Sequence, residues 1–122
     1  MHQAWKSMMS YKRGEVVLIR YPNSDLKTYK KRPALVVQAD GLKTGLRQRI
    51  VAMITSTLSR VGDTRVPVTR ASAEGQHMGL LTDSVVVTDN LATVLDREVD
   101  KTIGRCPNMQ AVDTALRRTL GL

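Results

Sequence analysis

The 122-residue sequence contains no phenylalanine, and aromatic residues make up only 3% of it. A buried core must therefore consist of aliphatic side chains and methionine. The only cysteine is Cys106, so no internal disulfide can form and a reducing compartment is expected. There is no apolar run of about 18 residues, as a membrane-spanning helix needs, and no signal-peptide pattern at the start. These absences favour a cytoplasmic protein.

The sequence is also poor in residues that bind metals or carry common catalytic chemistry. Its two histidines, His2 and His77, do not combine with Cys106 at the spacing of a zinc site. No Walker-type phosphate loop, G-x-S-x-G or H-E-x-x-H pattern is present. We therefore expect no metal and no cofactor. Any reaction must use Arg, Lys, Asp, Ser, Thr or Tyr side chains.

Positive charge, in contrast, is in excess. Nineteen Lys and Arg residues outnumber eleven Asp and Glu residues, which gives a formal net charge of +8. This excess indicates a polyanionic partner, either a nucleic acid or an acidic protein, although a basic surface that serves only solubility is the alternative. The densest segment is "KTYKKR" (27–32), which directly precedes the apolar run "PALVV" (33–37).

Short apolar and β-branched runs separated by turn residues predict a mainly β domain with one helix at its C-terminal end. We expect residues 1–13 to form a loose leader and residues 14–122 a single domain. The C-terminal helix is expected after Asn108 as N-cap, to end at Gly121, and 71–79 is expected to be a loop. Strands are predicted over 15–21, 33–40, 47–56, 65–70 (an edge strand, because of Pro67), 84–95 (two strands or one bent strand) and 101–106. The predicted architecture is a small, twisted, partly closed antiparallel barrel with the helix packed on it.

Arg32 is the leading candidate for a functional residue. It precedes Pro33 at a predicted strand start, which places a rigid guanidinium at the mouth of a loop. A guanidinium binds phosphate oxygens in a bidentate manner and remains charged. The alternative is an arginine that only solvates the loop.

Further candidates surround this residue in the predicted fold. The hydroxyls of Thr55 and Ser56 end the third strand, where they can donate to phosphate or close the following turn. Tyr21 and Tyr29 flank the basic segment and can stack on bases, although Tyr21 could instead cover the barrel edge. The candidate nucleic-acid contacts are Lys27, Tyr29, Lys30, Lys31 and Ser56.

Five segments in order resemble the MazF/PemK (Kid) toxin family of type II toxin–antitoxin systems. They are "RGEVVLIRYP", "KRPALVV", "IVAMITS", "GLLTDSVVVTDNLATV" and "IGR". The resemblance covers about residues 12–122. It implies a small SH3-like barrel of the CcdB/MazF type, a homodimer, and metal-independent cleavage of single-stranded RNA. It also implies a cognate antitoxin with an acidic, disordered C-terminal segment.

The resemblance further implies roles for individual residues. Arg32 matches the family's catalytic arginine, Thr55 its threonine at the end of the third strand, and Asp89 an acidic residue found in some members. The sequence departs from the family pattern at three positions, where Lys27, Val87 and Ala92 replace a glutamate, an arginine and a basic residue. These departures concern the substrate contacts and the acid–base chemistry.

The expected chemistry is attack of an RNA 2′-hydroxyl on the adjacent phosphorus, which yields a 2′,3′-cyclic phosphate. Arg32 and Thr55 would stabilise the developing charge. Asp89 is the candidate general base, since a guanidinium is a poor proton acceptor. Two alternatives are open: a non-catalytic nucleic-acid-binding barrel, and a gyrase poison of the CcdB type. The latter typically has an aromatic C-terminal tail, whereas this chain ends in Leu-Gly-Leu (120–122).

Overall fold

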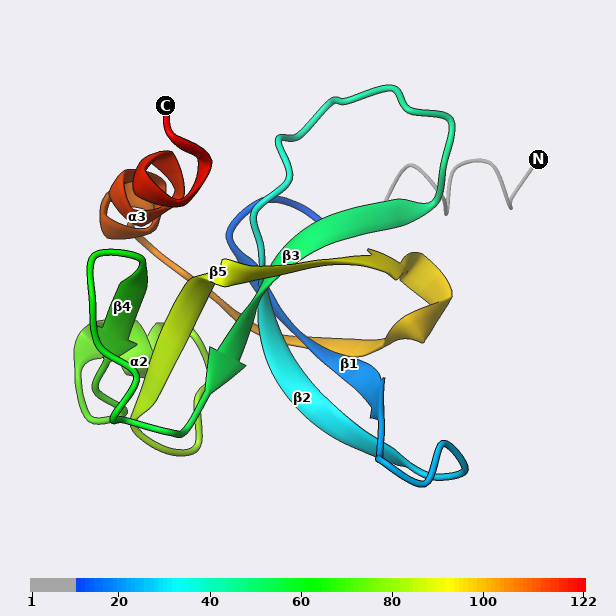
Figure 1. The fold of residues 1–122 in the computed structure, drawn as a ribbon, viewed down its shortest axis with the longest axis horizontal. Helices are drawn as coiled ribbons and strands as arrows, with labels where there is room; N and C mark the ends of the chain where they lie inside the picture. Colours follow the sequence, from blue (N-terminus) through cyan, green and yellow to red (C-terminus); the bar gives the residue numbers. More distant parts are fainter. Residues whose placement is uncertain (1–10) are drawn as a thin grey trace.

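The computed structural model describes residues 11–122, which form one antiparallel sheet with three short helical segments (Figure 1). The strand order is β4-β5-β3-β2-β1-β6. The elements are β1 (Glu15–Pro22), β2 (Tyr29–Val36), β3 (Gln48–Thr55), β4 (Arg65–Val68), α2 (Ala73–His77), β5 (Ser84–Leu95), η1 (Asp96–Glu98), β6 (Val99–Arg105) and α3 (Gln110–Leu120). The predicted mainly β fold with a C-terminal helix is therefore confirmed. Most of the predicted leader lies outside the described residues.

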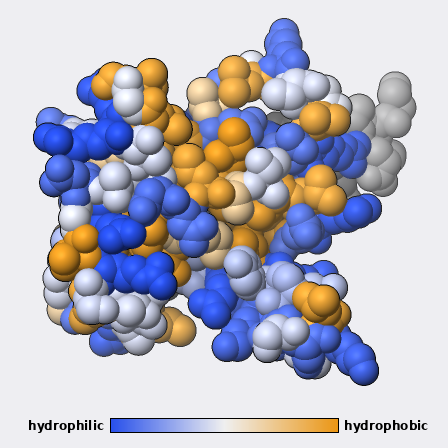
Figure 2. All heavy atoms as spheres, in the orientation of Figure 1, coloured by the Kyte–Doolittle hydropathy of each residue, from blue (hydrophilic) through white to orange (hydrophobic). Residues whose placement is uncertain are grey.

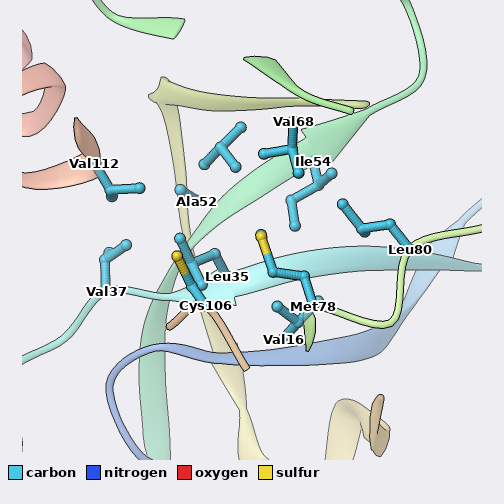
Figure 3. Packing of buried hydrophobic residues seen from close by; sticks show 11 residues of the cluster. Val16, Leu35, Val37, Ala52, Ile54, Val68, Met78, Leu80, Cys106 and Val112 are labelled. Atoms are coloured by element: carbon cyan, nitrogen blue, oxygen red, sulfur yellow. The ribbon is translucent and has the colours of Figure 1, made fainter. Parts of the chain in front are cut away.

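Both faces of the sheet are covered by apolar side chains, which explains why its strands read as continuous apolar runs. Val16 and Leu35 belong to a cluster on the face covered by α2 and α3, while Val17 and Ala34 belong to a cluster on the other face. Met78 lies in the middle of the first cluster (Figure 3). Aliphatic and sulfur-containing side chains thus make up this core, as the absence of phenylalanine requires.

The edge strands β4 and β6 do not pair with each other, so the sheet leaves one side of the barrel open. Helix α2 closes this side. The end of α2 packs against β6, backbone to backbone. A Cβ atom at Gly79 would collide with the carbonyl oxygen of Ile103, and one at Gly104 would collide with that of His77. The prediction of a loop over 71–79 is therefore wrong. The helix has only five residues, too few for an apolar periodicity, although Ser72 caps it by accepting a hydrogen bond from the Gly75 N–H at 3.0 Å.

Strand β2 begins at Tyr29, four residues earlier than predicted, so Pro33 lies within the strand. Pro33 pairs with Leu18 of β1, whereas pairing with β3 starts only at Ala34. The first half of β2 therefore has a neighbouring strand on one side only, and a proline without an N–H is tolerated there. As a consequence, Arg32 is held by the sheet and not by a loop.

The last third of the chain follows the predictions closely. β5 is one bent strand of 12 residues, with a register shift opposite Ala52 and Met53. Helix α3 ends at Gly121 in the left-handed conformation (φ 71°). Its N-cap is Met109 and not Asn108, but the Asn108 side chain still accepts a hydrogen bond from the Gln110 N–H at 2.9 Å. None of the helices within residues 11–122 is long and apolar enough to cross a membrane.

Candidate active site

The candidate site lies where β2 and β3 separate. Their pairing runs from Val36↔Val51 to Ala34↔Met53 and then stops, although both strands continue. Extending the same register by two residues sets Arg32 opposite Thr55, on the same face of the sheet. In Figure 1 the free ends of β2 and β3 point in different directions. Arg32 and Thr55, which are distant in sequence, both line the gap between the two strands.

This gap is a cleft of about 580 Å³. Its floor is apolar and includes Leu18, Ile54, Leu80 and Ile103. Its cations are Lys30, Lys31, Arg32 and Lys101, and its hydroxyl groups belong to Thr55, Ser56, Thr82 and Ser84. Within the described part of the chain, no carboxylate and no histidine lines it. A cleft with this lining concentrates positive potential and suits an anionic ligand.

The Arg32 side chain has no ion-pair partner among the described residues. It lies against the ring of Tyr21, with the guanidinium carbon 5.4 Å from the ring centroid. Its Nε is buried and makes no hydrogen bond, and no carboxylate among residues 11–122 forms an ion pair with it. An unsatisfied buried donor costs about 1–3 kcal/mol.

The environment of Thr55 is compatible with both roles expected from the sequence, which are closure of the following turn and donation to a phosphate. Its Oγ1 accepts a hydrogen bond from the Thr57 N–H at 3.1 Å, so the hydroxyl does close the following turn. Because the oxygen serves as acceptor there, the hydroxyl hydrogen is still available to a ligand in the cleft. Ser56 is exposed beside it and lines the same cleft.

The lysines divide into two groups. Lys30 and Lys31 line the cleft as the sequence suggested, and the Lys31 ammonium also lies 3.2 Å from the Asp100 carboxylate. Lys27 does not reach the cleft; it lies in the β1–β2 turn, where its N–H donates to Asp25. Lys101 of β6, in contrast, was missed. Its position depends on the pairing of β6 with Leu18 of β1, which no local sequence signal reveals.

Asp89 is not part of this cleft. Its two carboxylate oxygens accept hydrogen bonds from Arg65 of β4, at 3.2 Å from Nε and 3.0 Å from Nη2. The hydrogen bond from Arg65 lowers the pKa of Asp89. The β3–β5 register sets Val85 opposite Thr55, so Asp89 lies four residues further along β5. Asp89 is thus paired with Arg65 and is not among the residues that line the cleft.

Two other groups bear on the chemistry. Val87, at one of the departures from the family pattern, is buried between β3 and β4, so this position brings no charge to the cleft. Tyr29 does not line the cleft but an adjoining pocket, together with Lys31. Among residues 11–122, no group of three or more His, Cys, Asp or Glu side chains is arranged to hold a metal ion.

Residues 12–120 match the protein family described as PemK-like, MazF-like toxin of type II toxin–antitoxin system. No curated protein sequence matches the chain. A solved structure of an endoribonuclease in complex with its cognate antitoxin, from a mycobacterial species, is 25% identical, with a TM-score of 0.70 over 93% of this chain and 97% of that one. The Mycobacterium tuberculosis toxin MazF-mt6 is 27% identical, with a TM-score of 0.64 over 87% and 97%. A MazE–MazF complex from Deinococcus radiodurans shares the fold at 19% identity, with a TM-score of 0.68 over 93% and 98%.

Proposed function

Since the chain belongs to the PemK-like, MazF-like toxin family of type II toxin–antitoxin systems, we propose that it is an endoribonuclease that cleaves single-stranded RNA in the cleft between β2 and β3. The observation that carries this proposal is the guanidinium of Arg32. It lines a cleft rich in cations and hydroxyls together with Thr55, and no carboxylate among residues 11–122 forms an ion pair with it. A binding site for a phosphodiester needs these features.

In the proposed reaction, the RNA supplies its own nucleophile. The 2′-oxygen forms a bond to the adjacent phosphorus while the bond to the 5′-oxygen breaks, which gives a 2′,3′-cyclic phosphate and a 5′-hydroxyl. Arg32 and the Thr55 hydroxyl donate hydrogen bonds to the phosphoryl oxygens, where negative charge grows. Lys30 and Lys101 bind the flanking phosphates. We propose that no metal ion or cofactor takes part.

The proposed proton transfers use solvent. A guanidinium is a poor proton acceptor, and the described lining of the cleft contains no carboxylate or imidazole. The 2′-hydroxyl proton therefore passes to water or hydroxide, and the 5′-oxygen takes a proton from solvent as it leaves. Asp89, which was predicted as the base, stabilises the fold through Arg65 in this account.

We also propose the partners of the toxin. An antitoxin with an acidic, disordered segment would cover the basic cleft and exclude RNA by charge and by space. One of the similar structures is an endoribonuclease bound to its cognate antitoxin. We further propose that the active form is a cytoplasmic homodimer in which two clefts bind one RNA strand.

The function is tested with RNA and with a substrate that lacks one 2′-hydroxyl. A long RNA is incubated with the protein in EDTA, and the cut sites are mapped. An oligonucleotide of one cut site is then made twice, once as RNA and once with 2′-deoxyribose at the scissile nucleotide. We expect the RNA alone to be cut, with a cyclic phosphate on one product.

Cleavage of the deoxy substrate would refute attack by the 2′-hydroxyl. If both oligonucleotides bind and neither is cut, the protein is a nucleic-acid-binding barrel and not a nuclease. The Arg117→Ala variant is prepared in the same way and should cleave like the wild type, because Arg117 is exposed on α3 and does not line the cleft.

A further inference from the structure

A second cavity, of about 680 Å³, adjoins the cleft at the β1–β2 hairpin. Its lining consists of Arg20, Tyr29, Lys31, Arg97 and Glu98. Lys31 lines both this cavity and the cleft, so the two lie on either side of one lysine. Mostly hydrophilic residues cover this hairpin, at the lower right of Figure 2. A strand of RNA that leaves the cleft past Lys31 would enter the second cavity directly.

Two of the three cations of this cavity, Arg20 and Lys31, lie beside a carboxylate. Asp100 is only 20% exposed in its side chain and lies 3.2 Å from the Lys31 ammonium and 3.9 Å from the Arg20 guanidinium. The side chains of Arg20 and Lys31 are themselves more than half exposed. A fixed position with an exposed charged end reduces the entropy that these side chains lose when they bind a phosphate.

The acidic residue of the cavity has a structural task. Glu98 Oε1 accepts a hydrogen bond from the Leu95 N–H at 2.7 Å and so caps η1. The same helical turn carries Arg97, whose side chain contributes the third cation. Three cations thus stand against two carboxylates, Glu98 and Asp100, both of which are engaged, and the cavity keeps a net positive charge that favours an anion.

Tyr29 adds an exposed aromatic ring to the cations of this cavity. Its ring is 65% exposed at the start of β2, in a chain with very few aromatic residues. Nucleobases stack on exposed aromatic rings, while arginine and lysine bind the adjoining phosphates. The volume of the cavity is sufficient for at least one nucleotide.

We propose that this cavity is a second nucleotide subsite. It takes one nucleotide that flanks the scissile phosphate, with its base on the Tyr29 ring and its phosphate on Arg20 and Arg97. The subsite rests on the proposed function in one respect, because it requires that the same RNA strand also binds in the cleft.

The test measures binding, so that it does not depend on cleavage. The probes are single-stranded RNAs with 2′-deoxyribose at the mapped cut site, or arbitrary single strands if none is cut, in full length and trimmed by one nucleotide at a time from each end. For Tyr29→Ala we expect about tenfold weaker binding of the full-length probe, with an unchanged salt dependence, since one stacked base is lost. For Arg97→Ala we expect the slope of log K against log salt to fall by about 0.7, as for one phosphate contact on a single strand.

Trimming from one end should abolish both differences once the subsite nucleotide is gone. Arg117→Ala, with the same loss of charge on α3, should bind every probe like the wild type. The subsite is refuted if Tyr29→Ala and Arg97→Ala also bind like Arg117→Ala, or if their defects persist on every trimmed probe. That result would leave the nuclease proposal intact. Conversely, if the two variants show the expected binding defects but the wild type cuts no RNA, the subsite is supported and only the nuclease proposal is refuted.

Discussion

At the scale of single residues, the environment of Arg32 differs from that of Arg65 and Arg20. Arg65 is paired with Asp89 and Arg20 approaches Asp100, whereas the Arg32 guanidinium lies against the Tyr21 ring and forms no ion pair among residues 11–122. The Arg32 guanidinium is thus available to bind an anionic ligand. A guanidinium can place two parallel hydrogen bonds on a phosphate, which a lysine ammonium cannot do.

Thr55 should contribute less than Arg32, because it is a neutral donor. Thr55→Val keeps the shape of the side chain and removes the hydroxyl. A neutral hydrogen bond is worth about 1 kcal/mol, so we expect the single-turnover cleavage rate to fall about five- to tenfold. Ser56→Ala is the matched control for the neighbouring hydroxyl, and we expect it to change the rate less. An unchanged rate for Thr55→Val would remove this residue from the reaction.

Asp89 should matter for stability at neutral pH and not for cleavage. Arg65 lowers the folded-state pKa of Asp89 below its usual value of 3.8, so the stabilisation is fully present above that pH and is lost as the pH falls through the lowered pKa. We expect Asp89→Asn to lower the melting temperature at pH 7 and to match the wild type in strong acid. Its rate of RNA cleavage should remain near the wild-type rate; a loss of cleavage without a loss of fold would restore Asp89 as a catalytic residue.

The residues that could be predicted from the sequence are those that a local pattern marks. Arg32 and Lys30 belong to one basic run, and Thr55 ends an apolar run. Lys101 and Arg65 carry no such mark, because their neighbours come from strands far away in the sequence. Asp89 was assigned to the site by family resemblance alone, and the partner that occupies it was not visible in the sequence.

At the scale of elements, the site exists because β2 is longer than its pairing with β3. Pro33 cannot donate to a ladder, and β3 pairs with β2 only from Ala34 onward. The opened strands leave room for a ligand between Arg32 and Thr55. The strands themselves were predictable from β-branched runs, but the point where they separate depends on tertiary packing.

The contact of α2 with β6 offers a test of how the barrel closes. Gly79 and Gly41 both have a positive φ, but a Cβ would meet the Ile103 carbonyl at Gly79 and nothing within 4 Å at Gly41. Both alanine variants carry the backbone strain, and only Gly79→Ala adds a collision. We expect Gly79→Ala to be less stable than Gly41→Ala by about 2 kcal/mol or more in urea unfolding. Equal stabilities would show that α2 does not close the barrel in this way.

At the scale of the whole molecule, the net charge of +8 is distributed unevenly. Several carboxylates are engaged in ion pairs or turns, among them Asp89, Asp100 and Asp113. The cleft, in contrast, presents four cations, and among the described residues only Lys31 of these four lies beside a carboxylate. The composition predicted a polyanionic partner, but only the fold shows on which surface the uncompensated charge lies.

Binding of RNA should therefore depend steeply on salt. If each of the four cleft cations meets one phosphate, log K should fall with log salt with a slope of about 3. Lys101→Ala should reduce that slope by about 0.7, whereas Arg117→Ala on α3 should leave it unchanged. A slope that Lys101→Ala does not alter would show that β6 does not contribute to the RNA site.

In the proposed mechanism the Arg32 guanidinium stabilises the negative charge of the transition state, and the single-turnover rate of Arg32→Ala on a mapped RNA site measures this contribution. We expect the rate to fall by about 10²–10³, because one preorganised donor contributes that much. The melting temperature should remain close to that of the wild type, since the Arg32 side chain makes no hydrogen bond or ion pair within residues 11–122. A folded Arg32→Ala protein that cuts RNA at nearly the wild-type rate would contradict the account.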